Sequence, residues 1–423
     1  MAQTLAQGTM SKLVRLAVGS FTNNSIAATV PCIRRVNNYS TEAPQDGNEK
    51  EIKKSVFISQ SNDIFTNLAL EDWLYRNFDF TDHHVLLMWR NSPCVVIGRH
   101  QNPWLEANTI NLYHQGMELA RRNSGGGTVY HDNGNLNFTF FTPRAQYNRR
   151  NNLEIITRAL YREWAVQTEI SPREDIVIQG NYKQISGTAA KLGRPNAYHH
   201  CTLLVDINKV NLNQALRKVE KGIVTNATTS VPSPVMNLGE VNRNVKVELL
   251  LGAIGWEYLR TCPFTMEDGG QELISKQRGF QLVNPTEDWF PGLNKLRNEF
   301  QSWDWRYGKT PKFQVKRSFK VPQELIEETD VAEQELEICL DVNKGIIDDV
   351  TLTVPPGLKS TNGVHGEIRV VTSLRGRRFS EDAIITVENS LHDMRIQEDD
   401  MQREAARKNQ FVMNCMKQVM KSA

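Results

Sequence analysis

A regular pattern of apolar and polar positions begins near residue 55. The run VFISQ at 55–59 has strand-like composition, and residues 62–75 carry apolar side chains at helical spacing. The runs HVLLMWRN and CVVIG follow as two short strands, and Ser92 and Pro93 predict a break between them. The apolar side of the predicted helix is formed by Phe65, Leu68, Leu70 and Trp73.

Separate groups of helical and strand-like stretches follow through the next two hundred residues. Helices are predicted around 105–115, over 152–166 and over 246–260, and hairpins are predicted between 176 and 207. The segregation of these stretches favours an α+β domain with a mixed, mainly antiparallel sheet over a doubly wound parallel sheet. The clearest strand alternation is carried by Leu136, Phe138 and Phe140.

The pattern changes after about residue 312. The short β-type runs FQVKRSF, LEICLDV, VTLTV and IRVVTSL are separated by turns, and Ser380 is placed to cap a helix that begins with two acidic residues. A charged stretch with spaced apolar residues over 399–420 predicts a terminal helix. We therefore expect a leader at 1–50, a main domain at 51–310 and a small α/β accessory domain at 311–423.

The leader has the composition of a mitochondrial transit peptide. Residues 1–41 contain four basic residues, are rich in Ser, Thr and Ala, and precede the first acidic residue, Glu42. We expect cleavage between about Arg35 and Lys54 and a location in the mitochondrial matrix. The alternative is a slightly basic tail without a targeting role.

Composition narrows the class of protein. The formal net charge of +2 gives no strong attraction to nucleic acid or to an anionic membrane, and no apolar run reaches the length of a membrane helix. Six cysteines lie scattered without C-x-x-C spacing, which argues against a zinc site and a disulfide framework. The cysteines are Cys32, Cys94, Cys201, Cys262, Cys339 and Cys415.

A glycine-rich loop is the strongest candidate for chemistry. The stretch ARRNSGGGTVYHDNGNLNFTFF at 120–141 leads from one strand through Gly125–Gly127 into another. Glycines allow a sharp turn and close approach of a ligand, and successive N–H groups can bind an anion beside the guanidinium of Arg122. The alternative for three glycines alone is a simple hairpin turn.

This segment resembles the hallmark of the lipoate–protein ligase and lipoyltransferase family. Further motifs agree in order: GRHQNPW at 98–104, ISGTAAK at 185–191, HHCTLL at 199–204, TSVPSPVMNL at 229–238 and WDWRYGKTPKF at 303–313. Within the family they resemble most those of the animal mitochondrial lipoyltransferases. Biotin ligases share the family's fold, but the GRGR-type loop of those enzymes is missing here. The resemblance implies the biotin/lipoate ligase fold and a catalytic role for residues 51–310.

The resemblance also implies which residues bind substrate. Arg122 matches the arginine that contacts the phosphate of the acyl adenylate. For its neighbour Arg121, the alternative to ligand contact is a surface or structural role. His200 is expected to line the acyl pocket. A zinc site at His199-His200 is not expected, because neighbouring strand residues point to opposite faces. Gly126, Gly127, Thr128, Val129 and Tyr130 match the loop that approaches adenine and phosphate, although Tyr130 could equally be a packed strand residue.

The pair His131-Asp132 is expected to be structural. A general base would need an activatable nucleophile beside it, and the reaction implied by the resemblance uses the amine of an acceptor lysine instead. We expect Asp132 to accept turn N–H groups and His131 to bridge strands.

One lysine is expected to stabilise charge on the carbonyl and phosphate oxygens. Family members carry it directly before [IV]-SG, whereas this chain has Lys183 followed by the extra residue Gln184. The one-residue offset places Lys183 on the wrong face unless a bulge absorbs Gln184. We predict that bulge and a catalytic Lys183, with Lys191 as a weaker substitute.

The resemblance therefore implies a monomeric lipoyltransferase that uses lipoyl-AMP as its substrate. Its partners would be lipoyl domains of 2-oxoacid dehydrogenase complexes or the glycine-cleavage H protein. One alternative is a complete ligase, which would need ATP or GTP with Mg²⁺. Another is a module that binds the adenylate without catalysis, and an octanoyl or biotin transferase is more distant.

Overall fold

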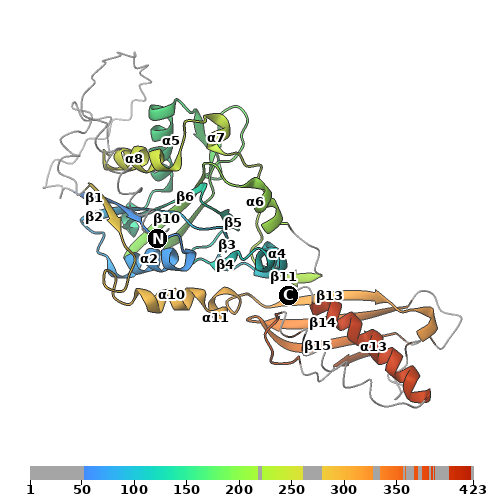
Figure 1. The fold of residues 1–423 in the computed structure, drawn as a ribbon. Coiled ribbons are helices and arrows are strands. Elements are labelled where there is room, and N and C mark those ends of the chain that lie inside the picture. Colours follow the sequence, from blue (N-terminus) through green and yellow to red (C-terminus); the bar gives the residue numbers. More distant parts are fainter. Residues whose placement is uncertain are drawn as a thin grey trace, which may run out of the picture.

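The computed structural model describes residues 52–217, 222–260, 279–326, 334–355, 358, 366–369, 374–380, 383, 385 and 400–420. Its centre is a six-stranded mixed sheet in the order β12-β1-β2-β6-β10-β9 (Figure 1). β1 pairs in parallel with both β12 and β2, and the pairs β2–β6, β6–β10 and β10–β9 are antiparallel. The predicted α+β class with a mixed, mainly antiparallel sheet is confirmed. The strands are β1 (Lys53–Ser59), β2 (His83–Trp89), β6 (Asn135–Pro143), β9 (Thr188–Leu192), β10 (Asn196–Leu204) and β12 (Gly279–Val283).

Helices cover both faces of this sheet. On one face α5 (Arg149–Trp164) and α8 (Val247–Leu259) pack, and on the other α2 (Ile64–Asn77) and α10 (Leu293–Gln301). Strand β6 contributes to both layers, because alternate side chains of a strand point to opposite faces. Leu136, Phe138 and Phe140 lie in the core beneath α5 and α8, and Phe141 lies in the core beneath α2.

The helix expected around 105–115 is two short helices. α3 (Pro103–Glu106) ends because Ala107 is extended, and α4 (Thr109–His114) begins where the side chain of Asn108 accepts a hydrogen bond from the N–H of Asn111. Asparagine is a favoured N-cap residue, and this capping preference outweighs the continuous helical pattern.

A second, three-stranded sheet carries the glycine-rich loop. Its order is β4-β3-β5, with β4 parallel and β5 antiparallel to β3. The loop that contains Gly125–Gly127 connects the two edge strands, β4 and β5, across the end of β3. The strands are β3 (Cys94–Ile97), β4 (Glu118–Arg121) and β5 (Val129–His131).

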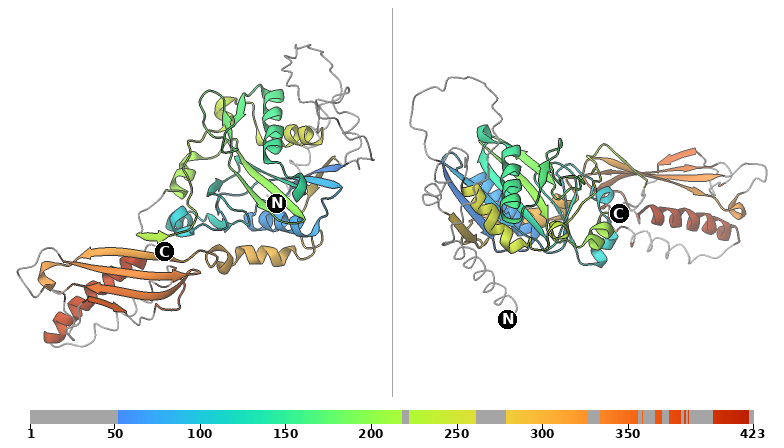
Figure 2. Two further views of the ribbon diagram at one scale, coloured as in Figure 1. Left: turned by 180° about the vertical axis from the view of Figure 1, so that it is seen from behind. Right: turned by 90° about the horizontal axis from the view of Figure 1, so that it is seen from above.

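A five-stranded sheet in the order β11-β13-β14-β15-β16 lies beside the main body, with the helix α13 (Asp400–Met420) packed against it (Figures 1 and 2). Its strands pair antiparallel, and β11 comes from the chain before residue 310. Helices α10 and α11 (Trp303–Arg306) lead from the main body into it. The strands are β11 (Ile223–Thr225), β13 (Phe313–Lys320), β14 (Glu335–Asn343), β15 (Ile346–Val354) and β16 (Gly366–Arg369).

The remaining short elements complete the main body. They are β7 (Thr168–Ile170), β8 (Ile176–Ile178), α6 (Lys209–Ala215) and α7 (Leu238–Val241). β7 and β8 form a two-stranded antiparallel sheet. Within the described ranges no helix combines the length and the apolar character needed to cross a bilayer. The expected transit peptide lies outside the described residues, and so do Glu381 and Asp382, the two acidic residues expected at the start of the helix after Ser380.

Candidate functional site

A cavity of about 930 Å³ lies between the central sheet and the glycine-rich loop. This volume is at the upper end of the range for small-molecule sites. Its buried wall includes Leu68, Trp89 and Val96, while Arg173 and Arg217 are exposed at its lining. The cavity brings together most of the residues expected from the sequence: Arg122, Gly126, Gly127, Thr128, Val129, Tyr130 and His200.

Two loops approach each other closely beside this cavity. A Cβ atom on Gly98 would lie 2.1 Å from the carbonyl oxygen of Gly126, so no larger residue fits at position 98 without moving the glycine loop. Gly126 itself has φ +86°, a conformation that side-chain-bearing residues rarely adopt. The GRHQNPW segment and the glycine-rich loop therefore form one packed unit.

Arg122 holds the glycine-rich loop in shape. Its side chain is buried, and its Nη2 atom donates to the carbonyl oxygens of Gly125 (2.6 Å) and Gly127 (2.7 Å). The Nη1 atom donates to the oxygen of Val96 (3.1 Å) and Nε donates to Ser124 Oγ (3.0 Å). Burial lowers the pKa of Arg122 to about 10, so it remains charged at neutral pH. Most of its donors are thus used on the loop itself, and its charge lies directly behind the loop.

Arg121 has a structural role, which was the alternative to ligand contact. The side chain is fully buried, and its guanidinium donates to backbone oxygens of Gln101 (2.8 Å) and Arg306 (2.8 Å) and to Thr310 Oγ1 (2.9 Å). Trp305 Nε1 donates in return to the carbonyl oxygen of Arg121 at 2.7 Å. Arg121 therefore connects the GRHQNPW loop to helix α11, away from the cavity lining.

A buried polar chain stands behind the cavity wall. His200 Nε2 lies 2.7 Å from Ser124 Oγ, and His200 Nδ1 lies 2.9 Å from Glu71 Oε1. Burial favours a raised pKa for Glu71, but His200 and the hydroxyl of Thr139 hold that pKa below its usual value. Because Ser124 Oγ already accepts from Arg122, its own hydrogen is free to bond His200 Nε2, and Nδ1–H then donates to Glu71.

The order serine, histidine, carboxylate is that of a hydrolase triad, but Ser124 is not a nucleophile in reach of substrate. Its side chain is buried and lies outside the cavity lining. Glu71 was not among the site residues predicted from the sequence. A signal was present, because Glu71 is three residues after Leu68 and shares the buried side of that helix.

The pair His131-Asp132 has the structural contacts expected of it. Asp132 accepts from the N–H groups of Gly134 (2.8 Å) and Asn208 (2.8 Å) and so fixes two turns. His131 Nδ1 lies 2.9 Å from Asn91 Nδ2, which connects β5 to the chain after β2. The ring of His131 also lines the cavity.

His199 and His200 lie on opposite faces of β10. His199 stacks on Phe140 with ring centroids 5.9 Å apart and faces the core, whereas His200 faces the cavity. Among the described residues no group of three or more His, Cys, Asp or Glu side chains has the arrangement of a metal site.

The predicted bulge at Gln184 is wrong. Gln184 pairs in register with Val177 on one side and Val235 on the other. The irregularity lies at Tyr182 and Lys183, just before Gln184: the N–H of Tyr182 donates to Ile178 O (3.0 Å), and Ile178 N–H donates to Lys183 O (3.0 Å). Tyr182 has φ +55°, so two residues stand opposite one, which is the geometry of a β-bulge.

The catalytic position predicted for Lys183 is therefore not supported. Since strand side chains alternate, Gln184 and Ser186 face the cavity, and Lys183 is exposed at the end of the hairpin outside the lining. Lys191 is bonded to Asp72 at 3.0 Å and also lies outside the lining. The lysine found in the described lining is Lys209 at the start of α6.

The segment expected at 229–238 lies along the cavity and is tied to the glycine-rich loop. Ser230 Oγ accepts from the N–H of Thr128 (2.8 Å) and from Gln101 Nε2 (3.0 Å), and Ser230 N–H donates to Glu106 Oε1 (3.1 Å). Thr128 Oγ1 donates to Gln101 Oε1 at 2.9 Å. These contacts connect three segments that are far apart in the sequence: residues 101–106, the glycine-rich loop and the segment around Ser230.

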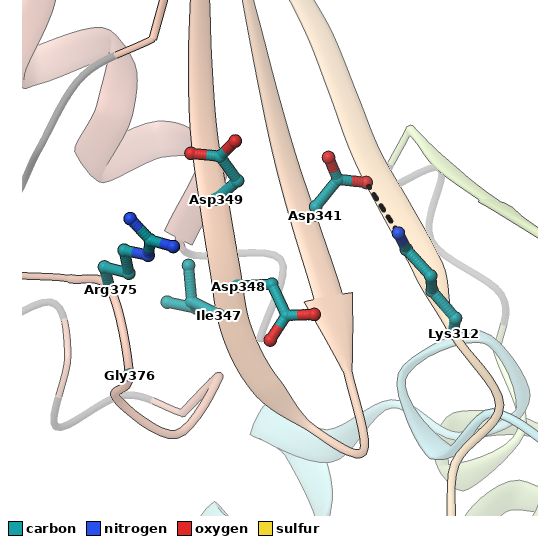
Figure 3. A pocket seen from close by; sticks show the side chains of 7 residues that line it. All are labelled: Lys312, Asp341, Ile347, Asp348, Asp349, Arg375 and Gly376. Carbon is teal, nitrogen blue, oxygen red and sulfur yellow. Dashed lines mark ion pairs between the residues drawn. The ribbon is translucent and has the colours of Figure 1, made fainter.

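A smaller hollow of about 420 Å³ lies on the C-terminal sheet (Figure 3). Its charged side chains come from β14, β15 and the neighbouring turns, and Lys312 Nζ lies 3.9 Å from Asp341 Oδ1. Ile347 is its one apolar side chain. This hollow lacks the buried apolar wall of the larger cavity.

Comparison with known proteins agrees with the geometry. Residues 63–254 match the lipoyl protein ligase A/B catalytic domain family. The mitochondrial lipoyl amidotransferase LIPT1 of Mus musculus is 43% identical over 305 residues, which cover 71% of this chain and 76% of that protein. The Homo sapiens protein of the same name is 41% identical over 320 residues, covering 74% and 80%.

More distant relatives have related names. The lipoate-protein ligase A of Psychrobacter cryohalolentis is 36% identical over 62% of this chain and 74% of its own length. Among solved structures, that of P. falciparum LipL1 in complex with lipoate superposes with a TM-score of 0.52 at 24% identity, covering 85% of this chain and 99% of that one. That likeness shows a common fold.

Proposed function

The chain belongs to the lipoate–protein ligase and lipoyltransferase family, and on that premise we propose that it transfers a lipoyl group from lipoyl-AMP to a lysine of an acceptor protein. It is an acyltransferase of this family, and its mammalian relatives carry mitochondrial names, which supports a location in the mitochondrial matrix. Acceptors are lipoyl-carrying proteins. The finer choice among them, lipoyl domains of 2-oxoacid dehydrogenase complexes or the glycine-cleavage H protein, is part of the proposal.

The proposal is supported most by the cavity, whose buried and accessible parts have different linings. Its buried wall is largely apolar, and its accessible part combines the glycine-rich loop with Arg149, Arg173, Lys209 and Arg217. An acyl adenylate has matching parts, because its acyl chain is apolar and its phosphate is anionic. Cations and backbone N–H groups near a phosphate stabilise the charge that develops when an amine displaces it.

The reaction needs positioning more than it needs a protein nucleophile. Lipoyl-AMP is a mixed anhydride; the neutral ε-amine of the acceptor lysine attacks its carbonyl carbon, AMP leaves with the bonding electron pair, and the amide loses a proton. The enzyme's part is to hold carbonyl and amine together and to balance charge on the phosphate. Arg122 would act through the loop that it shapes, and Gly126 to Tyr130 would form the wall beside the adenylate.

Complete ligase activity is the second candidate, since the chain is 36% identical to a lipoate-protein ligase A. A ligase would convert lipoate and ATP or GTP, with Mg²⁺, to lipoyl-AMP before transfer. Incubation of the chain with an acceptor and either lipoyl-AMP or lipoate plus nucleotide separates the two. We expect transfer from lipoyl-AMP, and equal transfer from lipoate plus nucleotide would show a ligase.

Gln184 also gives a reason to test for a binding module without catalysis. Because Gln184 faces the cavity, its neighbour Lys183 is exposed outside it. Lys183→Ala is therefore expected to keep transfer within about threefold of wild type, as is usual for an exposed position. Gln184→Lys should raise single-turnover transfer by about tenfold, because it adds a positive charge beside the adenylate. A loss of 10²–10³ in Lys183→Ala would instead show that substrate binding turns Lys183 inward. Absence of transfer in every variant would support the binding module.

We also propose a boundary near residue 310 between the catalytic and accessory domains. Support comes from the separate sheet that starts with β13 and from its own apolar core. β11 and Trp104 contribute to that sheet and core from outside the proposed range, which would hold the two domains together. Limited proteolysis should give a protected fragment that ends near residue 310, and cleavage without such a fragment would oppose this boundary.

N-terminal sequencing of the mature protein should find its first residue between positions 35 and 54. An intact Met1 would oppose the expected cleavage of the transit peptide.

A further inference from the structure

Four consecutive side chains before the three glycines are each bonded to a different part of the fold. Arg121 bonds to the backbone of α11, Arg122 to the glycine-rich loop itself and Ser124 to strand β10. Asn123 is the fourth, and its partner lies on helix α2. The glycines that follow have no side chains of their own, so the shape of the loop depends on the residues that precede it.

The side-chain amide of Asn123 is held at both of its ends. Its Nδ2 atom donates to Asp72 Oδ1 at 2.6 Å, and its Oδ1 atom accepts from Arg99 Nη1 at 2.7 Å. These partners fix which end is the nitrogen, because a guanidinium only donates and an ionised carboxylate only accepts. The backbone N–H of Arg99 also donates to the carbonyl oxygen of Ser124 at 2.9 Å. Asn123 therefore connects the GRHQNPW segment to helix α2.

Asp72 is a buried carboxylate with three partners. The residue is 1% exposed. Besides the bond from Asn123, its Oδ1 atom accepts from Lys191 Nζ of strand β9 at 3.0 Å, and Arg76 forms an ion pair with its Oδ2 atom. A buried carboxylate is unfavourable unless it is paired and hydrogen-bonded. Of the two cations, the side chain of Lys191 is 25% exposed and that of Arg76 is 50% exposed, so water screens the charge of Lys191 less.

A second contact holds Lys191 toward α2. Its Nζ atom lies 4.2 Å from the ring centre of Tyr75, three residues after Asp72 on that helix, and a cation is attracted to an aromatic face. Neither Lys191 nor Asp72 belongs to the cavity lining. The route from this ion pair to an adenylate in the cavity therefore runs through Asn123 and the loop.

We propose that Asp72 is a positioning residue that fixes the glycine-rich loop through Asn123, and that Lys191 serves the reaction as the counter-ion of Asp72. The inference rests on the proposed function, because it names what holds the loop in the geometry for acyl transfer. A displacement of about 1 Å near reacting atoms can lower a rate about 10²-fold. Without Lys191, the carboxylate is left to Arg76 and is drawn away from Asn123.

The test measures the single-turnover rate constant for transfer from bound lipoyl-AMP at saturating acceptor. An unfolded fraction lowers the amplitude of that reaction and leaves its rate constant unchanged, so a purely structural role does not alter this quantity. Asp72→Ala and Lys191→Met should each lower the rate constant by about tenfold, since each removes a charged hydrogen-bonding partner.

A double variant separates a counter-ion from a catalytic lysine. Asp72→Asn combined with Lys191→Met keeps an oxygen that accepts from Asn123 and removes both charges of the pair. Its rate constant should return to within about threefold of wild type. A lysine that touched the adenylate itself would leave the double variant as slow as Lys191→Met.

Lys316→Met is the matched control. Lys316 is also a strand lysine paired with a carboxylate, Glu337 at 2.8 Å, but it belongs to the C-terminal sheet. Its substitution should leave the rate constant at the wild-type value.

The inference is overturned if the rate constant of Asp72→Ala stays within about threefold of wild type. A double variant no faster than Lys191→Met overturns it as well, and this comparison decides the matter if Asp72→Ala does not fold. A wild-type chain that binds lipoyl-AMP without transferring the acyl group would refute the proposed function alone. The inference then predicts the same order of variants in the dissociation rate constant of lipoyl-AMP, fastest in Asp72→Ala and Lys191→Met, and equal dissociation rates would refute it.

Discussion

Replacing Arg122 with alanine is expected to lower single-turnover lipoyl transfer from lipoyl-AMP by about 10²–10³. The variant loses the two donors that hold the carbonyl oxygens of Gly125 and Gly127, and it loses the charge behind the loop. The hydrogen bond from Arg122 to Ser124 Oγ is lost as well. The series of hydrogen bonds from Ser124 through His200 to Glu71 therefore loses its first donor. The loop geometry and the electrostatic contribution should therefore be lost together.

Thermal unfolding must accompany this measurement, because removing this buried arginine leaves carbonyl oxygens unpaired, at a cost of about 1–3 kcal/mol for each buried group. Arg150→Ala is the matched control, since Arg150 is an exposed arginine of α5 whose ion pair with Glu154 lies within the same helix. That variant should transfer at the wild-type rate. If folded Arg122→Ala also transferred normally, the loop would be an ordinary hairpin without a role in the reaction.

Gly98→Ala is expected to reduce transfer by about 10² or more, although it adds a single methyl group. The new Cβ atom would lie 2.1 Å from the carbonyl oxygen of Gly126, and backbone atoms cannot rotate away as a side chain can. The glycine-rich loop must shift, and a displacement of about 1 Å at a reacting centre can lower the rate about 10²-fold.

Gly125→Ala provides the control, in the same structural unit and with the same added atom. No atom lies within 4 Å of a Cβ built on Gly125, and its φ is not in the left-handed range. That variant should transfer within about threefold of wild type. Equal losses in both variants, or no loss in Gly98→Ala, would contradict the packing described for the two loops.

Local patterns were enough to predict the central elements. Alternation placed Leu136, Phe138 and Phe140 on one face of a strand, and they share one core. Helical spacing predicted α2, α5 and α8 to within a few residues at their ends. Partners distant in sequence could not be predicted in this way, as with the parallel pairing of β1 and β12, where Ser55 stands opposite Gly279.

The different roles of neighbouring residues of the same type could be distinguished only in the structure. Arg121 and Arg122 have identical chemistry, but strand alternation sends one toward α11 and the other toward the glycine-rich loop. The position of Gln184 depended on the positive φ of Tyr182, a residue type that gives no local signal for that conformation. Glu71 acquires its role only from His200, which lies 129 residues away.

Lipoyl transfer by this chain can be measured by mass spectrometry of an acceptor lipoyl domain after incubation with the full chain and purified lipoyl-AMP. We expect one added lipoyl group per acceptor, mapped by peptide fragmentation to a single lysine, with little addition when Arg122→Ala or Gly98→Ala replaces wild type. An acceptor mass that stays unchanged, under conditions in which folded wild type binds lipoyl-AMP, would contradict this expectation.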